Sequence, residues 1–369
     1  MSVAPLSVVV CGGSIGGLAA AVALHRLGAR VRVYESSSSS LEQRGSSIGY
    51  CNVGLWEALR GEKMIRRGTQ AQRSQGAFFY GDLWRFLAAG LPAGTIRYNA
   101  TIADLGEAPL TRPSVDGEAF DLAVIADGGW SALREKYFEK RLPEYAGWQA
   151  WRFRVDMEHV PGFSAMGEYV QGNMFTILLD VAKDDGQTIL AGGTGVAADE
   201  RNVIRPSKGA NRQVSDPVPR EDDTAITAAF LDVFRNAFGQ KKEVMRAMEA
   251  AARHGKITPN PQYEYCANSV VKGRMVLVGD AAHMAVPRTA AGAHTAVMDG
   301  YALLEAFSPV MMEERDKLLP DWGSVVDRAL AAYGPAGLNR AKDLYARSLE
   351  VSKPVCAPGW MRENGAQDL

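Results

Sequence analysis

Residues 8–35, VVVCGGSIGGLAAAVALHRLGARVRVYE, constrain the fold of this chain more than any other segment. A continuous apolar run at 6–11 predicts a strand buried on both faces, and a glycine-rich turn follows it. Small and apolar residues at helical spacing then predict a helix over 18–27, which Gly28 ends. A second strand is expected at 31–34, closed by Glu35. This βαβ arrangement predicts a parallel sheet.

The turn has the spacing of a nucleotide-binding G-x-G-x-x-G sequence, except that Ser14 takes the middle place between Gly12 and Gly17. In such a turn, backbone N–H groups at a helix N-terminus hold a phosphate group, and the helix dipole assists them. The middle residue must be small, and a serine offers its hydroxyl to the phosphate. Glu35 is placed to accept hydrogen bonds from a ribose. A glycine-rich turn that binds no nucleotide is the alternative for this segment taken alone.

Length and charge limit the remaining choices. A chain of 369 residues exceeds what one hydrophobic core usually serves, so we expect two domains or one large elaborated domain. The net charge is −1 without a long run of one sign, which argues against nucleic-acid binding and stable membrane association. The cysteines and the five histidines are scattered, so we expect no metal centre and a reducing, cytoplasmic compartment. The cysteines are Cys11, Cys51, Cys266 and Cys356.

Parallel-sheet segments recur along the chain. Buried-strand patterns appear at 122–126 and 274–283, and a helix of small residues is expected over 290–307. Between them, 167–180 and 187–196 alternate like antiparallel strands, and helices are expected at 223–237 and 241–253. We therefore expect an α/β fold, in which a Rossmann-like domain made of separated pieces carries an inserted α+β domain built on an antiparallel sheet.

Two further segments support the interpretation that the chain binds a nucleotide. They are DLAVIADGGWSALR (121–134) and RMVLVGDAAHMAVPRTAAGAHTAVMDGYALLEAF (274–307). With the first turn, they make the chain resemble the FAD-dependent aromatic hydroxylases of the para-hydroxybenzoate hydroxylase family, the group A flavoprotein monooxygenases. That family is marked by G-x-G-x-x-G with a ribose carboxylate, a central D-G segment, and G-D-A-A-H-x-x-x-P. The resemblance covers roughly residues 6–155 and 260–307.

One branch of that family explains why Ser14 stands at the middle glycine position of the turn. GGSIGGL resembles the G-G-S-I-S-G-L of the dihydroxypyridine hydroxylase branch, where serine also replaces the middle glycine. The segments AGWQAWRF (146–153) and PRTAAGAHTA (287–296) are similar to the same branch. Ser14 is thus expected as a subgroup variant.

The resemblance implies an organisation and an activity. It implies an FAD-binding domain from 1–145 and 265–307, a substrate domain over 146–264, and a helical tail over 308–369. It also implies a monooxygenase that hydroxylates a small aromatic or N-heteroaromatic substrate through a flavin C4a-hydroperoxide. FAD would be bound, NADH or NADPH and O2 would be transient co-substrates, and a homodimer is the default assembly.

The resemblance also implies roles for individual residues. The first turn and the second strand end would hold the FAD pyrophosphate and adenosine ribose through Gly12, Gly13, Ser14, Ile15, Gly17, Glu35 and Ser36. The loop beside the flavin would be Arg44, Gly45, Ser46 and Ser47. Asp127 and Gly128 would orient FAD, and Asp280 would meet its ribityl or pyrophosphate oxygens. A helix N-terminus at Ala291, Gly292, Ala293 and His294 would stabilise negative charge on the reduced ring.

Three residues are candidates for catalysis. Pro287 would lie beside the isoalloxazine on the substrate side. His294 is either a proton acceptor near the flavin or a polar residue packed on the ribityl chain. Arg152 either holds a substrate carboxylate or phenolate or forms a salt bridge between domains. Trp148 and Trp151 are expected either to wall the aromatic pocket or to pack in the core.

The chain departs from the family pattern at some positions. The usual G-Q-G-x-N has become Ala290-Ala291-Gly292-Ala293-His294, and Tyr80 replaces a frequent arginine. The span between the helix at 53–59 and Gly81 is short, which leaves the cover of the substrate cavity open. Two alternatives follow: a flavin-dependent reductase or halogenase of the same fold, or a catalytically inactive flavin-binding protein. The tryptophans of W-Q-A-W do not have the halogenase spacing W-x-W-x-I-P.

Overall fold

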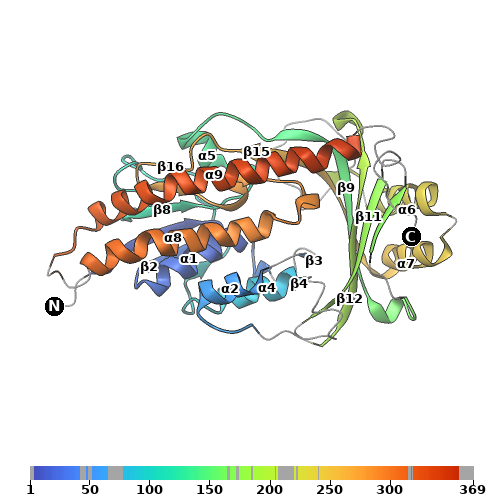
Figure 1. Cartoon of the computed structure of the whole chain (residues 1–369), viewed down its shortest axis with the longest axis horizontal. Coiled ribbons are helices and arrows are strands. Elements are labelled where there is room, and N and C mark those ends of the chain that lie inside the picture. The colour runs from blue at the N-terminus through green and yellow to red at the C-terminus, as the bar shows by residue number, and fades with distance from the viewer. Residues whose placement is uncertain are drawn as a thin grey trace.

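The chain folds around two six-stranded sheets (Figure 1). The structure, a computed structural model, describes residues 4–41, 47–48, 52–64, 78–163, 167–171, 174–183, 186–203, 205–206, 220–221, 223–239, 241–314, 317 and 319–356. In Figure 1 the first sheet and its helices lie on the left, and the second sheet stands nearly on edge at the right.

The first sheet is the parallel sheet that the opening segment predicts. Its strands, in spatial order, are β16 (Val271–Lys272), β17 (Met275–Leu277), β8 (Leu122–Ile125), β1 (Ser7–Cys11), β2 (Arg30–Tyr34) and β5 (Ile96–Arg97). Only β16 runs antiparallel to its neighbour among these pairs. The side chains of β1 are all buried, as expected for a central strand covered on both faces.

Helices cover this sheet. They are α1 (Ile15–Arg26), α2 (Val53–Arg60), α4 (Tyr80–Ala88), α5 (Ala132–Tyr137), α8 (Gly292–Glu314) and α9 (Trp322–Cys356). Because α1 is built from small residues, α8 packs closely against it, and α9 packs on α8. Shorter elements of this part are β3 (Ser47–Ile48), β4 (Phe78–Phe79), β6 (Ser114–Val115), β7 (Glu118–Ala119), η4 (Gly279–Ala281) and η5 (Pro287–Thr289).

The second sheet is antiparallel wherever its strands pair. In spatial order it contains β10 (Gly167–Gln171), β11 (Met174–Ala182), β12 (Thr188–Ala197), β9 (Glu144–Asp156), β15 (Lys256–Cys266) and β18 (His283–Met284). Its other elements are η2 (Met157–His159), η3 (Glu200–Asn202), β13 (Arg205–Pro206), β14 (Arg220–Glu221), α6 (Asp223–Phe238) and α7 (Lys242–His254).

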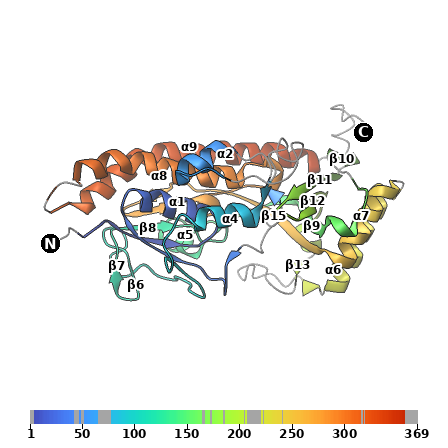
Figure 2. The same cartoon turned by 90° about the horizontal axis from the view of Figure 1, so that it is seen from below.

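The two faces of the second sheet have different partners, because side chains alternate along β9. Trp151, Phe153 and Val155 are buried against α6 and α7 on the outer face. Trp148 and Ala150 point the other way and pack with Val286 of the first domain. Figure 2 shows α6 and α7 at one end of the molecule, beyond the sheet. Arg152 and Arg154 share the inner face by the same alternation.

Two elements differ from the sequence prediction. The strand expected over 274–283 ends at Leu277, because Gly279 has a φ of +59° and turns the chain into η4. The helix expected over 290–307 begins at Gly292 and continues through Pro309 to Glu314. The remaining expected helices and the β11–β12 hairpin are present within a few residues of their predicted positions.

The described helices include none that is both long and apolar enough to cross a bilayer.

Candidate functional site

The turn between β1 and α1 is closed by two glycines. Gly12 has a φ of +112°, and a Cβ atom there would lie 2.2 Å from the carbonyl oxygen of Ala126. A Cβ atom on Gly17 would lie 1.9 Å from the carbonyl oxygen of Gly12. Neither position accepts a side chain, so the chain turns tightly enough for α1 to start directly above the ends of β1 and β8.

Ser14 precedes α1 but does not cap it. Its hydroxyl lies 2.8 Å from the hydroxyl of Tyr80 at the start of α4, and its side chain accepts no helix N–H. The N–H groups of Ile15, Gly16 and Gly17 donate to no described residue. They are left open at the positive end of the helix dipole, which is the arrangement that binds a phosphate group.

Glu35 is held beside this turn. Its carboxylate accepts the N–H of Gly13 at 2.9 Å and that of Ser37 at 2.8 Å, and the Ser36 hydroxyl donates to it at 3.4 Å. The indole N–H of Trp84 donates to the Gly13 carbonyl at 2.8 Å. Glu35 is therefore buried and oriented at the end of β2, where a ribose acceptor was expected.

The D-G segment lies at the end of β8. Asp127 is exposed to solvent yet closely surrounded by protein, and desolvation raises the pKa of its carboxyl. Gly128, with a φ of +92°, has open space where a Cβ would stand. Arg134, which the sequence interpretation did not single out, is 1% exposed and donates to the carbonyls of Gly129 and Ala281. It joins the D-G segment to the G-D-A-A-H segment.

Asp280 of η4 and Arg152 of β9 interact electrostatically. Asp280 is solvent-exposed in concave surroundings that raise its pKa by desolvation, while His283 and Arg152 oppose that rise. Burial lowers the pKa of Arg152, and Asp280 opposes that fall. Arg152 makes no hydrogen bond or ion pair with any residue that the structure describes. The Arg152 guanidinium of the second sheet is thus close enough to Asp280 for the two charges to interact.

The N-terminus of α8 completes the site. Pro287 begins η5, and Ala290, with a φ of +51°, turns the chain into the helix. The N–H of Ala291 donates to the Thr289 hydroxyl, whereas the N–H groups of Gly292, Ala293 and His294 find no acceptor among the described residues. Burial lowers the pKa of His294, and its Nδ1 atom is buried without a hydrogen-bond partner among the described residues. His294 is therefore neutral at pH 7.

A buried network of charged residues contacts the G-D-A-A-H segment. The Asp299 carboxylate of α8 lies 2.7 Å from His283 Nε2 and accepts the N–H of Gly279 at 3.0 Å. Arg340 of α9 donates to its other oxygen at 3.1 and 3.2 Å. The Asp299 carboxylate raises the pKa of His283, and His283 and Arg340 lower that of Asp299 despite burial. The sequence did not point to Asp299 or Arg340, which carry no motif signal.

The structure places the remaining residues that the sequence singled out as follows. Trp148 and Trp151 are both buried, at 1% and 2% exposure, in the packing of opposite faces of the second sheet. The backbone of Ser47 pairs with Phe79 across β3 and β4. Arg44, Gly45 and Ser46 lie outside the described residues, as does most of the short span between α2 and α4.

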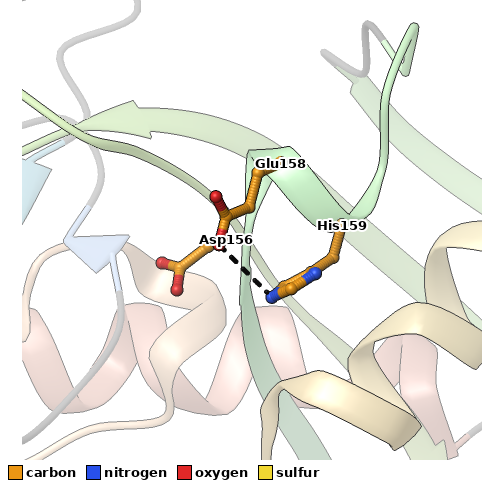
Figure 3. Close-up of side chains that lie close together, drawn as sticks. All are labelled: Asp156, Glu158 and His159. Atoms are coloured by element: carbon orange, nitrogen blue, oxygen red, sulfur yellow. Dashed lines mark ion pairs between the residues drawn. The ribbon is translucent and has the colours of Figure 1, made fainter.

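One exposed cluster brings metal-ligand types together away from these residues. Ligand atoms of Asp156, Glu158 and His159 lie within 4.8 Å of one another at the end of β9, as Figure 3 shows. His159 pairs with Glu158 at 3.5 Å. All three are exposed, and such acidic groups are common without a metal ion.

Several groups described above fit FAD. The open N–H groups of α1 and α8 suit its pyrophosphate and ring, and Glu35 is oriented for its ribose. Asp127 and Asp280 add carboxylates that face solvent. A family model described as "FAD binding domain" matches residues 121–324, more than half of the chain. The chain belongs to this family.

The named activities of similar proteins agree with membership of this FAD-binding family. The chain is 24% identical to 3-amino-4-hydroxybenzoate 2-monooxygenase PtmB3 of Streptomyces platensis, over 93% of this chain and 87% of that protein. It is 25% identical to 6-hydroxynicotinate 3-monooxygenase of Bordetella bronchiseptica, over 83% and 84% respectively. These homologues are FAD-dependent monooxygenases of aromatic or heteroaromatic substrates.

Solved structures share the fold. The structure of 2,6-dihydroxypyridine-3-hydroxylase from Arthrobacter nicotinovorans matches with a TM-score of 0.71 at 18% identity, covering 96% of this chain and 93% of that one. HpxO of Klebsiella pneumoniae, complexed with FAD and uric acid, matches with a TM-score of 0.71 at 19% identity, covering 98% and 91%. The expected α/β fold with a parallel FAD-binding sheet is confirmed.

Proposed function

We propose that this chain is an FAD-dependent monooxygenase that hydroxylates a small aromatic or N-heteroaromatic substrate. One observation carries the proposal: Arg152 of the second sheet interacts electrostatically with Asp280 of the G-D-A-A-H segment, yet has no hydrogen-bond or ion-pair partner among the described residues. A site with a flavin-type cradle on one side and an unpaired cation on the other suits an electron-rich, anionic ring. Reactions of this kind place the hard chemistry on the cofactor, so no protein nucleophile is required.

Each group of residues has its own role in the proposed reaction. The first turn and Glu35 hold FAD, which supplies the activation of O2 when it is bound. The open N–H groups of Gly292 and Ala293 stabilise negative charge at the end of the helix dipole. Arg152 binds the carboxylate or phenolate of the substrate and orients its ring.

His294 handles a proton in this proposal. Because burial lowers its pKa, its imidazole is neutral and its unpartnered Nδ1 is available to accept a phenolic proton. Pro287 lines the approach to the ring without offering a proton or a charge. The residues act by binding, orienting and moving one proton.

The proposal extends to the co-substrates and the setting. NADH or NADPH supplies the electrons and O2 supplies the inserted oxygen atom. The scattered cysteines, of which Cys11 and Cys266 are buried free thiols, support a reducing cytoplasmic location. A homodimer is the proposed assembly. We also propose the domain boundaries that the resemblance implies, with the inserted substrate domain over 146–264.

The first experiment is the visible absorbance spectrum of the protein after incubation with FAD, with the released chromophore identified. Two flavin bands and NAD(P)H oxidation stimulated by one of a panel of hydroxylated rings, with a hydroxylated product, are expected. A protein that stays colourless with FAD contradicts the proposal. Oxidation of NAD(P)H that yields only peroxide, with every ring tested, would instead indicate a reductase.

The role of Arg152 needs its own variant. Arg152→Met should raise the KM for the anionic ring about tenfold or more, since a charge-assisted hydrogen bond to the substrate is lost. Its thermal stability should change little, because the side chain has no described partner. A stability loss with an unchanged KM would assign Arg152 to domain pairing instead.

A further inference from the structure

The chain between β18 and α8 carries Pro287 and leads into the N-terminus of α8, so it borders the ring side of the proposed site. We call residues 286–291 the ring-side segment. Val286, its first residue, is extended, with φ and ψ of −67° and 146°, which suits a residue before a proline. Ala290 has a left-handed φ of +51°, a conformation that is unfavourable for a residue other than glycine. Such a backbone persists only where its surroundings hold it in place.

The ring-side segment is closed by hydrogen bonds of its own. The Thr289 hydroxyl donates to the Val286 carbonyl at 2.9 Å and accepts the N–H of Ala291 at 3.2 Å. The N–H of Ala290 donates to the Pro287 carbonyl at 2.9 Å. Because one side chain joins Val286 to Ala291, a displacement of Val286 is transmitted to the start of α8.

Ser348 of α9 fixes the beginning of this segment. The N–H of Val286 donates to the Ser348 hydroxyl at 2.9 Å, and that hydroxyl donates to the Glu264 carboxylate of β15 at 2.8 Å. All three residues are buried. A serine hydroxyl has one proton to donate, and because the carboxylate takes it, the oxygen accepts from Val286. The two bonds together define the position of a buried backbone N–H group.

A second contact joins the ring-side segment to α9. The Arg288 guanidinium donates to the Val351 carbonyl at 3.0 Å, close to Ser348 along the helix. Val351 also packs on the small cluster that contains Val286. In Figure 1 this end of α9 lies beside β9. The segment is therefore attached to α9 both at Val286 and at Arg288.

Val286 also lies against the second sheet. It packs with Trp148 and Ala150, which share the inner face of β9. Arg152 is the next residue on that face, about 7 Å along the strand from Ala150. The position of Val286 therefore determines how far Pro287 and the start of α8 stand from Arg152.

We propose that Ser348 is a positioning residue for hydroxylation, which sets the ring-side segment at the correct distance from Arg152 through the Val286 N–H. This inference rests on the proposed function, in which Arg152 orients the ring and the start of α8 stabilises negative charge. Ser348 touches neither substrate nor cofactor, and its effect is transmitted through the backbone of residues 286–291. Insertion of oxygen requires a ring held in the correct geometry, so a displaced segment should favour loss of that oxygen as peroxide.

Ser352 provides a matched control. It is also buried in α9, and it donates at 2.7 Å to the same Glu264 oxygen as Ser348 does. It accepts from the Trp148 indole at 3.3 Å and makes no hydrogen bond with the ring-side segment, all of which the structure describes. Both Ser348→Ala and Ser352→Ala remove one hydroxyl donor from Glu264. Only Ser348→Ala also removes the acceptor of the Val286 N–H.

The first experiment compares the FAD-loaded parent, Ser348→Ala and Ser352→Ala. Hydroxylated product and H2O2 are measured with the ring that the parent hydroxylates; without insertion, NAD(P)H and a proton reduce O2 to H2O2. The ratio of product to H2O2 should fall about tenfold in Ser348→Ala, because a small displacement of reacting groups slows insertion. Ser352→Ala should keep the ratio of the parent. Equal ratios in all three proteins, or equal falls in both variants, would overturn the inference while the proposed function stands.

The midpoint potential of the bound flavin is a readout that needs no substrate. In the proposed function the N–H groups of Gly292 and Ala293 stabilise negative charge on the reduced ring, so their displacement should lower the potential. We expect a lower potential in Ser348→Ala only, and equal potentials in all three proteins would overturn the inference. A parent that hydroxylates no ring would refute the proposed function, and a potential lowered in Ser348→Ala alone would still show that Ser348 positions α8. A parent that binds no FAD would overturn both.

A further variant covers the case in which Ser348→Ala does not fold. Ser348→Cys keeps a side chain of similar size, but its thiol is a weak donor and a weak acceptor. A lower ratio of product to H2O2 than in the parent would support the inference, and an equal ratio would overturn it. Hydrogen exchange of the Val286 N–H in the parent needs no variant. Slow exchange is expected there, and exchange as fast as in an exposed loop would overturn the inference.

Discussion

Two groups of charges in this molecule behave in opposite ways. Around Asp299 each charge meets an opposite one, and both His283 and Asp299 are 1% exposed. The second group is Arg152 and Asp280, which interact electrostatically, although Arg152 makes no hydrogen bond or ion pair with any described residue. Charges that the chain itself compensates hold elements together, whereas charges that it leaves uncompensated are available to a ligand.

The sharpest way to test this contrast is Asp299→Asn. The change leaves Arg340 and His283 without their buried carboxylate, so it should lower the free energy of unfolding by about 3–5 kcal/mol. Thermal and denaturant unfolding measure it. The same substitution at Asp327, which is 60% exposed and pairs with Arg274 at 3.3 Å, should cost less than about 1 kcal/mol. Equal losses at both positions would refute the distinction.

A glycine pair gives the next largest effect. Gly12→Ala drives a Cβ atom into the Ala126 carbonyl, so we expect a loss of more than about 2 kcal/mol and of bound FAD. Gly128→Ala meets only the strain of its φ of +92° and should lose about 1 kcal/mol. Flavin content and melting temperature report both. FAD retained in Gly12→Ala would show that the first turn does not set the cofactor site.

The pH dependence of stability tests the buried network from another side. The pKa of His283 is raised in the folded protein, so its contribution is fully present below its ordinary value of 6.5 and is lost as pH rises through the raised value. The difference in unfolding free energy between the parent and His283→Gln should therefore shrink on going from acid to alkaline pH. A difference that grows instead would mean that the histidine is neutral when folded.

The smallest effect is expected at Ser14. Its hydroxyl is engaged by Tyr80, so Ser14→Gly should change the dissociation constant of FAD by no more than about threefold. Tyr80→Phe serves as the paired variant and should behave alike. A tenfold loss in Ser14→Gly alone would show that the serine hydroxyl contacts the phosphate.

Local patterns were readable from the sequence because their physics is local. The apolar run before Gly12, the helix of small residues and Glu35 at a strand end predicted the βαβ unit and its turn. Arg152 was found through a resemblance, and alternation along β9 explains why it shares a face with Arg154.

Long-range partners were not readable. Arg340 meets Asp299 across 41 positions of sequence, and Arg134 meets Ala281 across 147. Phe79 of β4 and the corner between α7 and β15 line a common hollow, and no spacing in the sequence signals that they come together. The role of Tyr80 as a partner of Ser14 likewise depends on how α4 packs, since the two are 66 positions apart.

Helix α9 limits how the two domains move. It is 35 residues, or about 50 Å, long; Trp322 at its start donates to the Ala4 carbonyl, and Arg340 at its middle contacts Asp299 of α8. Toward its other end, Ser348 and Ser352 donate to Glu264 of the second sheet, and Ser352 accepts from Trp148. A continuous helix that is attached at both ends restricts the relative movement of the parts that it connects. Hinge opening between the two sheets would therefore require α9 to detach or bend.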